Sequence, residues 1–185
     1  MIKSLIAASA ALFVSASAHA ATTLDFTELS SGFQGSTSVS VTGATINGTG
    51  ATTDLFRGAG GISNSICFIN GGRCEGDGEI VFDSIVSNVS FDVGGFDPGD
   101  ASVVSAVDSM SNVLASINIG NDGSFGFGAL SGIAKLVIDD SSTGAGFVYG
   151  NVTFDAATNP VPVPAAAPLM LAGLGLLARR RRQKA

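Results

Sequence analysis

The sequence has one tyrosine, no tryptophan and one histidine among its 185 residues. The histidine, His19, lies in the first twenty residues, where Lys3 precedes an apolar run that ends in small residues. This is the pattern of a secretory signal peptide, and Ala18 and Ala20 predict cleavage before Ala21. The mature chain would then contain no histidine, which excludes Ser-His-Asp and Cys-His catalysis and any metal site that needs imidazole.

The N-terminal segment is too short for the alternative reading, a membrane anchor. A membrane span needs about 20 apolar residues, whereas the mainly apolar run from Leu5 to Val14 has ten. We therefore expect export through the Sec machinery and removal of residues 1–20 by signal peptidase.

Basic residues are scarce between the two ends of the chain. All fifteen carboxylates lie between Asp25 and Asp155, where only Arg57, Arg73 and Lys135 are basic, so the side chains of this stretch sum to fifteen minus three, a charge of −12. A surface of that sign repels phosphate backbones, which argues against nucleic acid as a partner. It suits a protein kept soluble by self-repulsion, or one that binds divalent cations.

Long hydrophobic runs are also absent, and the most apolar stretch near the C-terminus is short. Residues 165–178 are fourteen apolar or small residues, and as a helix they would reach about 21 Å, less than the roughly 30 Å of a hydrocarbon core. Four arginines and Lys184 follow, and such cations stay on the cytoplasmic side. We expect a short transmembrane helix over 165–178 and a basic cytoplasmic tail over 179–185.

A proline-containing box precedes this helix, and the arginine cluster closes it. The box consists of Val161, Pro162, Val163, Pro164 and Ala165, and the cluster of Arg179, Arg180, Arg181 and Arg182. This order of elements resembles the VPLPA variant of the PEP-CTERM sorting signals of exported bacterial proteins, with Val163 in place of leucine. The alternative is an ordinary C-terminal membrane anchor.

The resemblance implies a membrane-embedded sorting enzyme, an exosortase, as a partner. It would cut near the box and release or transfer the protein, which is held only transiently in the inner membrane, to the cell surface or extracellular space. Proteins of this type commonly accompany exopolysaccharide production.

Helical periodicity is absent from residues 21–158, which we expect to form one domain followed by a linker over 159–164. Glycine, serine and threonine recur, and Val89, Phe91 and Val93 alternate with polar residues, as in a strand with one buried face. Turn residues at 108–112 and 121–123 separate such segments. We predict an all-β fold, an antiparallel β-sandwich, with strands over 22–29, 37–42, 66–69, 79–83, 88–93, 102–107, 113–119, 133–139 and 147–154.

The stretch from Phe91 to Phe154 resembles the sandwich domain that often precedes PEP-CTERM signals and has jelly-roll relatives among carbohydrate-binding modules. The resemblance implies a jelly-roll-like fold and an alternative function, recognition of exopolysaccharide with possible support from calcium. An aspartate often occupies the position of Asn151 in such domains, so the amide puts a calcium ligand there in doubt. Eleven phenylalanines are expected to fill the core, and Tyr149 is the only aromatic with a polar edge for stacking on sugars.

Only two cysteines are present, Cys67 and Cys74, and they enclose the turn sequence Ile-Asn-Gly-Gly. In an exported chain this spacing predicts a structural disulfide. The alternative, a reactive thiol or a metal ligand, is disfavoured because two sulfurs without histidine make a poor metal set.

Acidic residues in three loops suggest a weaker calcium hypothesis, because calcium prefers carboxylate and carbonyl oxygens. No loop has the EF-hand pattern, and acids that shape exposed turns are the alternative. A glycosidase pair of carboxylates is disfavoured, since so many acids make chance pairs certain. We therefore expect no enzymatic activity and no firm cofactor, with calcium candidates at Glu75, Asp77, Glu79, Asp97, Asp100, Asp139 and Asp140.

Overall fold

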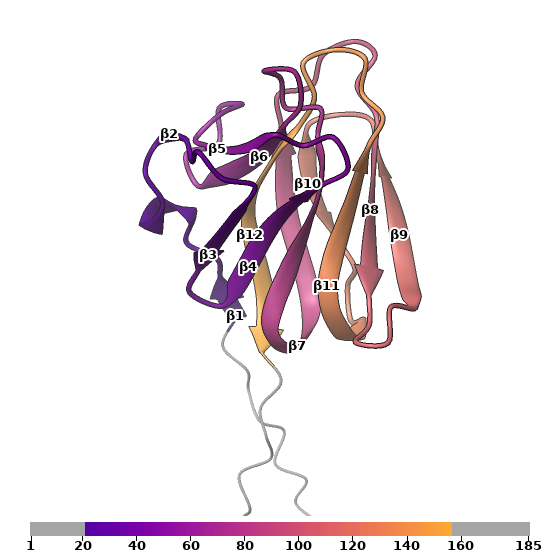
Figure 1. Ribbon diagram of the computed structural model, residues 1–185. Helices are drawn as coiled ribbons and strands as arrows, with labels where there is room; N and C mark the ends of the chain where they lie inside the picture. The colour runs from indigo at the N-terminus through magenta and orange to yellow at the C-terminus, as the bar shows by residue number, and fades with distance from the viewer. Residues whose placement is uncertain (1–20, 157–185) are drawn as a thin grey trace, which may run out of the picture.

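The computed structural model describes residues 21–156, which form an all-β fold with one short 3₁₀ helix, η1 (Phe26–Glu28) (Figure 1). Twelve strands pair in antiparallel fashion within one large sheet. Within residues 21–156 no helix has the length and hydrophobicity to cross a membrane. The strands are β1 (Ala21–Thr23), β2 (Gly32–Phe33), β3 (Ser38–Val41), β4 (Ala44–Thr49), β5 (Asp54–Arg57), β6 (Ser65–Ile69), β7 (Asp77–Gly94), β8 (Ser102–Val107), β9 (Val113–Ile119), β10 (Gly123–Gly126), β11 (Ser131–Asp140) and β12 (Val148–Ala156).

Several predicted features lie outside the described residues. Ala18 and Ala20 of the signal peptide do so, whereas Ala21, the residue expected after the cut, is the first residue of β1. The linker over 159–164, the helix over 165–178 and the tail over 179–185 also lie outside, and so do the sorting-signal residues Val161, Pro162, Val163, Pro164, Ala165, Arg179, Arg180, Arg181 and Arg182.

The long strand β7 organises all the other pairings. Its first half pairs with β4 on one side and β11 on the other, and its second half pairs with β12 and β10. Two groups of strands therefore meet along β7. The first group contains β3, β4, β11, β8 and β9, and the second contains β2, β5, β6, β12, β10 and β1.

β7 is strongly bent between its two halves. Gly78, Ile80 and Phe82 are buried in the first half, and the burial then shifts to the odd positions Val89, Phe91 and Val93. The switch needs an extra residue, and Asn88, with φ of 53°, takes the left-handed conformation found in bulges. The prediction of two separate strands, 79–83 and 88–93, was therefore wrong, because residues 84–87 between them continue the same strand and do not form a loop.

The two ends of β7 lie near each other as a result. Cys74, just before β7, forms a bridge with Gly146, and a Cβ on Gly95, just after β7, would lie 3.6 Å from the Gly146 carbonyl oxygen. We call this end of the domain, made of residues 70–77, 95–101 and 140–147, the loop pole. Backbone hydrogen bonds from Thr143 to Gly99 (3.1 Å) and from Cys74 to Ala145 (2.9 Å) join its three loops.

The first and last described residues lie beside the bend of β7, away from the loop pole. Ala21 pairs with Asp155, and Asp155 pairs with Ser87. Figure 1 shows β1 and the end of β12 near each other at the foot of the domain. We call this end the terminal pole.

One main hydrophobic cluster contains side chains from both groups of strands. Six of the eleven phenylalanines are buried, and Phe82 and Phe154 pack with their ring centroids 4.9 Å apart. Phe33 and Phe96 are exceptions to the predicted core role, with 60% and 40% of their surface exposed.

The clearest alternation in the sequence gave the most accurate strand predictions. β8 and β9 begin and end at the predicted residues, whereas β2, β4, β5 and β10 were not predicted. The strand predicted over 22–29 is also wrong beyond Thr23. There Asp25 accepts a hydrogen bond from the Thr27 amide (2.8 Å) and starts η1, as aspartate does at helix N-termini.

Gly78 offers a test of packing where β7 passes the core. A Cβ at this position would overlap the ring of Phe68, which is fully buried. We expect Gly78→Ala to lower the free energy of unfolding by about 1–3 kcal/mol through overpacking. Gly120→Ala is the control, since a Cβ there meets nothing within 4 Å. Urea denaturation of both variants measures the difference, and equal stability of the two would contradict the packing described here.

Candidate functional site

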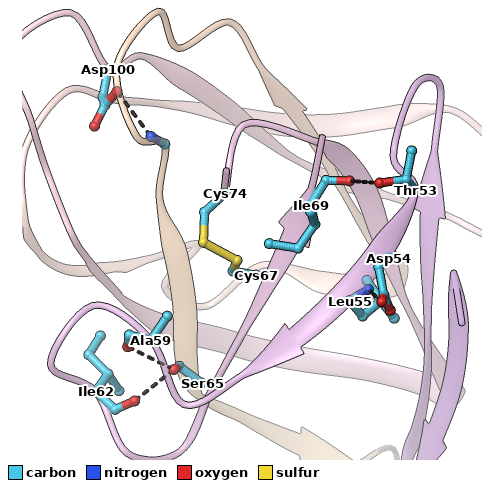
Figure 2. The surroundings of a disulfide bond; sticks show 11 residues. Thr53, Asp54, Leu55, Ala59, Ile62, Ser65, Cys67, Ile69, Cys74 and Asp100 are labelled. Atoms are coloured by element: carbon cyan, nitrogen blue, oxygen red, sulfur yellow. Dashed lines mark hydrogen bonds between the residues drawn. A yellow bond between two sulfur atoms is a disulfide. The ribbon is translucent and has the colours of Figure 1, made fainter. Parts of the chain in front are cut away.

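The predicted disulfide is present and closes a tight hairpin (Figure 2). Cys67 in β6 and Cys74 are bonded, with Cα atoms 5.3 Å apart. Between them Asn70 and Arg73 exchange two backbone hydrogen bonds, of 2.9 and 3.1 Å. The turn needs positive φ at both central residues, 59° at Gly71 and 87° at its neighbour, which glycine adopts without a steric penalty.

Both cysteines are thus used in the bond, and neither is a free thiol. The closed loop is short, so the chain-entropy account gives a stabilisation of about 2 to 3 kcal/mol. The disulfide holds the hairpin at the loop pole, where Arg73 donates to the Gly144 carbonyl oxygen (3.1 Å).

Asp100, in the loop between β7 and β8, joins two loops of the loop pole by hydrogen bonds. It is buried, with 6% of its surface exposed. Its Oδ1 accepts from the Gly146 amide (3.2 Å) and its Oδ2 from the Asp97 amide (2.8 Å); Figure 2 shows the first bond reaching across to the neighbouring loop. Both carboxylate oxygens therefore accept hydrogen bonds from backbone N–H groups, and these bonds offset the desolvation penalty of burying the carboxylate.

Asp77 and Asp140 lie at the same pole. The Asp77 carboxylate accepts from the Asp140 amide (2.9 Å), and Asp140 Oδ1 accepts from the Ser142 amide (2.8 Å). The other Asp140 oxygen is buried and has no hydrogen-bond partner. Burial, and to a lesser extent the negative charge of Asp100, raises the pKa of Asp140.

Tyr149 lies close to this acidic group, in the core. Its hydroxyl donates to Ser102 Oγ at 2.8 Å. Burial raises the pKa of Tyr149 far above its ordinary value, and the negative charges of Asp140, Asp77 and Asp100 add to that increase. The tyrosine is therefore a buried structural donor, and it offers no exposed ring for stacking on a sugar.

The structure brings only some of the calcium candidates together. Asp77, Asp100 and Asp140 share the loop pole, where they accept backbone amide hydrogens, the role expected of acids that shape turns. Glu79 is instead paired with Lys135 at 2.7 Å. Within residues 21–156 no group of three or more histidine, cysteine, aspartate or glutamate side chains is placed to hold a metal ion. Glu75 and Asp97 also lie in the loop pole, where the Asp97 amide donates to Asp100, and Asp139 is exposed beside Asp140 at the end of β11.

A second polar cluster was not predicted from the sequence. The sequence Asn-Val-Ser-Phe-Asp at 88–92 recurs as Asn-Val-Thr-Phe-Asp at 151–155. The two copies lie in β7 and β12 and run antiparallel, with Ser90 opposite Thr153. Both asparagines have positive φ, 53° at Asn88 and 45° at Asn151. The two copies of the repeat are thus related to each other by a local twofold arrangement of the backbone.

The side chains of the two copies form a symmetric row of hydrogen bonds. The side-chain Nδ2 of Asn151 donates to Asp92 Oδ2 (2.7 Å), and the side-chain Nδ2 of Asn88 donates to Asp155 Oδ2 in the reciprocal bond. Between them the Ser90 and Thr153 hydroxyls are 2.6 Å apart. We call this row the polar ladder, and its members are Asn88, Ser90, Asp92, Asn151, Thr153 and Asp155.

The polar ladder lies on the outer side of β7 and β12, because Val89, Phe91, Val152 and Phe154 between its members are buried. Three members, Asn88, Ser90 and Asn151, are exposed and the other three are half-buried. Side-chain amide, hydroxyl and carboxylate groups in such a row can exchange hydrogen bonds with a polyhydroxylated ligand. The internal repeat was the signal in the sequence that would have located it. Asn151, considered alone as a lost calcium ligand, instead pairs with Asp92.

The half-buried Asp140, one of whose carboxylate oxygens is fully buried, makes stability depend on pH. The pKa of Asp140 in the folded protein is raised above its ordinary value of 3.8, so folding favours the protonated carboxyl group. Its contribution to the free energy of unfolding is therefore fully present below pH 3.8 and is lost as the pH rises through the raised pKa. We expect Asp140→Asn, which keeps the acceptor for Ser142, to be more stable than wild type at about pH 7 and equal to it at about pH 3.

Asp139→Asn, at the exposed neighbouring position, is the control and should match wild type at both pH values. Urea midpoints measure the effect. An Asp140→Asn variant that is no more stable than wild type near neutral pH would show that burial of this carboxylate carries no penalty.

Comparison of the chain with protein-family models, with curated proteins and with solved structures finds no match. Its function must therefore be inferred from its own residues and their arrangement.

Proposed function

We propose that this chain is an exported, non-enzymatic protein of the cell surface or extracellular matrix, whose C-terminal sorting signal is processed by an exosortase. The observation that carries the proposal is the order of three elements at the C-terminus. The VPVPA box at 161–165 is followed by an apolar segment too short for an ordinary span, and then by the arginines at 179–182.

The position of the described chain ends supports this proposal. Ala21 and Asp155 are paired at the terminal pole. A cut before Ala21 and a cut near the box would both act on chain that leaves from this pole. The loop pole and the polar ladder would be left intact, and the loop pole would point away from the membrane while the protein is still anchored.

We further propose that the two groups of strands are the two layers of a jelly-roll-like β-sandwich. The bent β7 contributes one half to each group, and one main core cluster takes side chains from both. Sandwiches bury such side chains between their inner faces. A disulfide-closed domain of this kind suits the oxidising exterior of the cell.

Processing can be tested directly on the protein recovered from its producing cells. We expect mass spectrometry to find the mature N-terminus at Ala21 and the mature C-terminus between Val161 and Ala166. Replacing Pro162 and Pro164 by alanine should leave the arginine-rich tail attached, because the box would no longer be recognised. Replacing Pro168, outside the box, is the control and should leave processing unchanged.

An intact tail on the mature wild-type protein would overturn the sorting proposal and leave the alternative, a simple membrane anchor.

A second candidate function, recognition of exopolysaccharide, is favoured by the polar ladder. Its side-chain amides, hydroxyls and carboxylates lie in a partly exposed row, and Asp92 also accepts a hydrogen bond from Ser124 in β10. Sugar hydroxyls both donate and accept, so they could replace the bonds that these groups now make with one another.

A glycan array probed with the intact protein tests this second candidate. We expect Asp92→Asn and Asp155→Asn each to weaken binding about tenfold or more, since a hydrogen bond to a charged group contributes about 1.5–3 kcal/mol. Asp83→Asn, exposed at the bend of β7, should bind as wild type does. Loss of binding with a chelator would add calcium to the site, and an array without any bound glycan would reject this function.

A further inference from the structure

Strand β9 is the last strand on one side of the sheet. It pairs with β8, and among the strands that the structure describes none lies on its other side. In Figure 1 it forms the free edge of the first group of strands. Such an edge presents a row of backbone N–H and C=O groups that can pair with a further strand.

The usual protections of an edge strand are missing here. Natural edges are blunted by charges, by proline, by bulges or by short length. β9 is seven residues long, and the stretch from Ser109 to Asn121 contains neither proline nor any charged residue. The irregularity in its pairing lies only at the start of the strand, opposite Val107.

Apolar side chains are exposed at this edge. Met110, Val113 and Leu114 have 77%, 63% and 37% of their surface exposed. Ile117 packs against the core but is only partly buried, because no described strand covers its outer side. One more strand beside β9 would cover Ile117 and extend the core by one row.

The charge distribution indicates what that strand is. The stretch from Asp25 to Asp155 has fifteen carboxylates and three basic residues, so two copies repel each other over most of their surfaces. The uncharged edge is where two copies can approach without bringing carboxylates together. A basic partner would be drawn to the acidic surfaces instead, and it would gain nothing from a neutral edge.

We propose that β9 pairs in antiparallel fashion with β9 of a second copy, so that the sheet continues across a twofold axis. Pairing of a strand with itself about a twofold axis is the self-complementary contact typical of homodimers. A register centred on Ser116 would place Val113 of each copy opposite Ile119 of the other. The exposed apolar surface of both copies would then be covered by the same contact.

The test measures the mass of the intact chain in a mild detergent by light scattering coupled to size exclusion. We expect a dimer for wild type and a monomer for Ser116→Lys, because the substitution places two ammonium groups face to face at the centre of the contact. Ser40→Lys is the matched control. Ser40 is also exposed on a strand at the margin of the sheet, and its hydroxyl likewise bonds a cross-strand hydroxyl.

Ser40→Lys should remain dimeric. A monomeric wild type, or a Ser116→Lys protein with the mass of wild type, overturns the proposal.

Cross-linking keeps the proposal testable if the lysine variant fails to fold. The native cysteines are bonded to each other, so Ser116→Cys introduces one reactive thiol. A short bis-maleimide should join two copies of this variant and should not join two copies of Ser40→Cys. The opposite pattern, or no cross-linked dimer with either variant, overturns the pairing, and neither result bears on whether the C-terminal signal is processed.

Discussion

The bend in β7 is the constraint on which the rest of the structure depends. A single strand of 18 residues forms part of both groups of strands, and it can do so only because the left-handed Asn88, which lies between the buried residues Val86 and Val89, shifts its buried side from even to odd positions. Without that shift, Phe91 and Val93 would face water, because a change of one residue reverses every side chain of a strand. The core cluster that joins the two groups therefore requires this bend.

The bend also separates the two ends of the domain. It brings both ends of β7 to the loop pole. There the disulfide hairpin forms a bridge with Gly146 of the β11–β12 loop, and the Gly146 amide donates a hydrogen bond to Asp100. It leaves β1 and the end of β12 at the terminal pole. The acidic residues of the loop pole are largely engaged by backbone amides, so their chemistry there is that of structural acceptors. The more accessible polar groups are those of the polar ladder, on the outer face of β7 and β12.

Much of the fold could be predicted from local pattern, and the remainder depended on distant contacts. β8 and β9 alternate regularly and were predicted to the residue. The disulfide followed from two cysteines around a glycine turn. β4 was not predicted, and it is held by a distant contact, since Gly48 pairs with Gly78 of β7. The polar ladder was missed because its two halves are more than 50 residues apart in the chain and become neighbours only when β12 pairs with β7.

The all-β class, the acidic charge and the disulfide could be read from the chain alone, because each depends on residue type and on local spacing, and the proposed signals at the two ends rest on the same kind of information. Tertiary structure alone decided that two predicted strands are one bent strand, which acids meet at the loop pole, and that two copies of a five-residue repeat face each other. The physical reason is that pairing between strands distant in the chain, and burial against a shared core, decide register and proximity, and neither is encoded in the local pattern of any one segment.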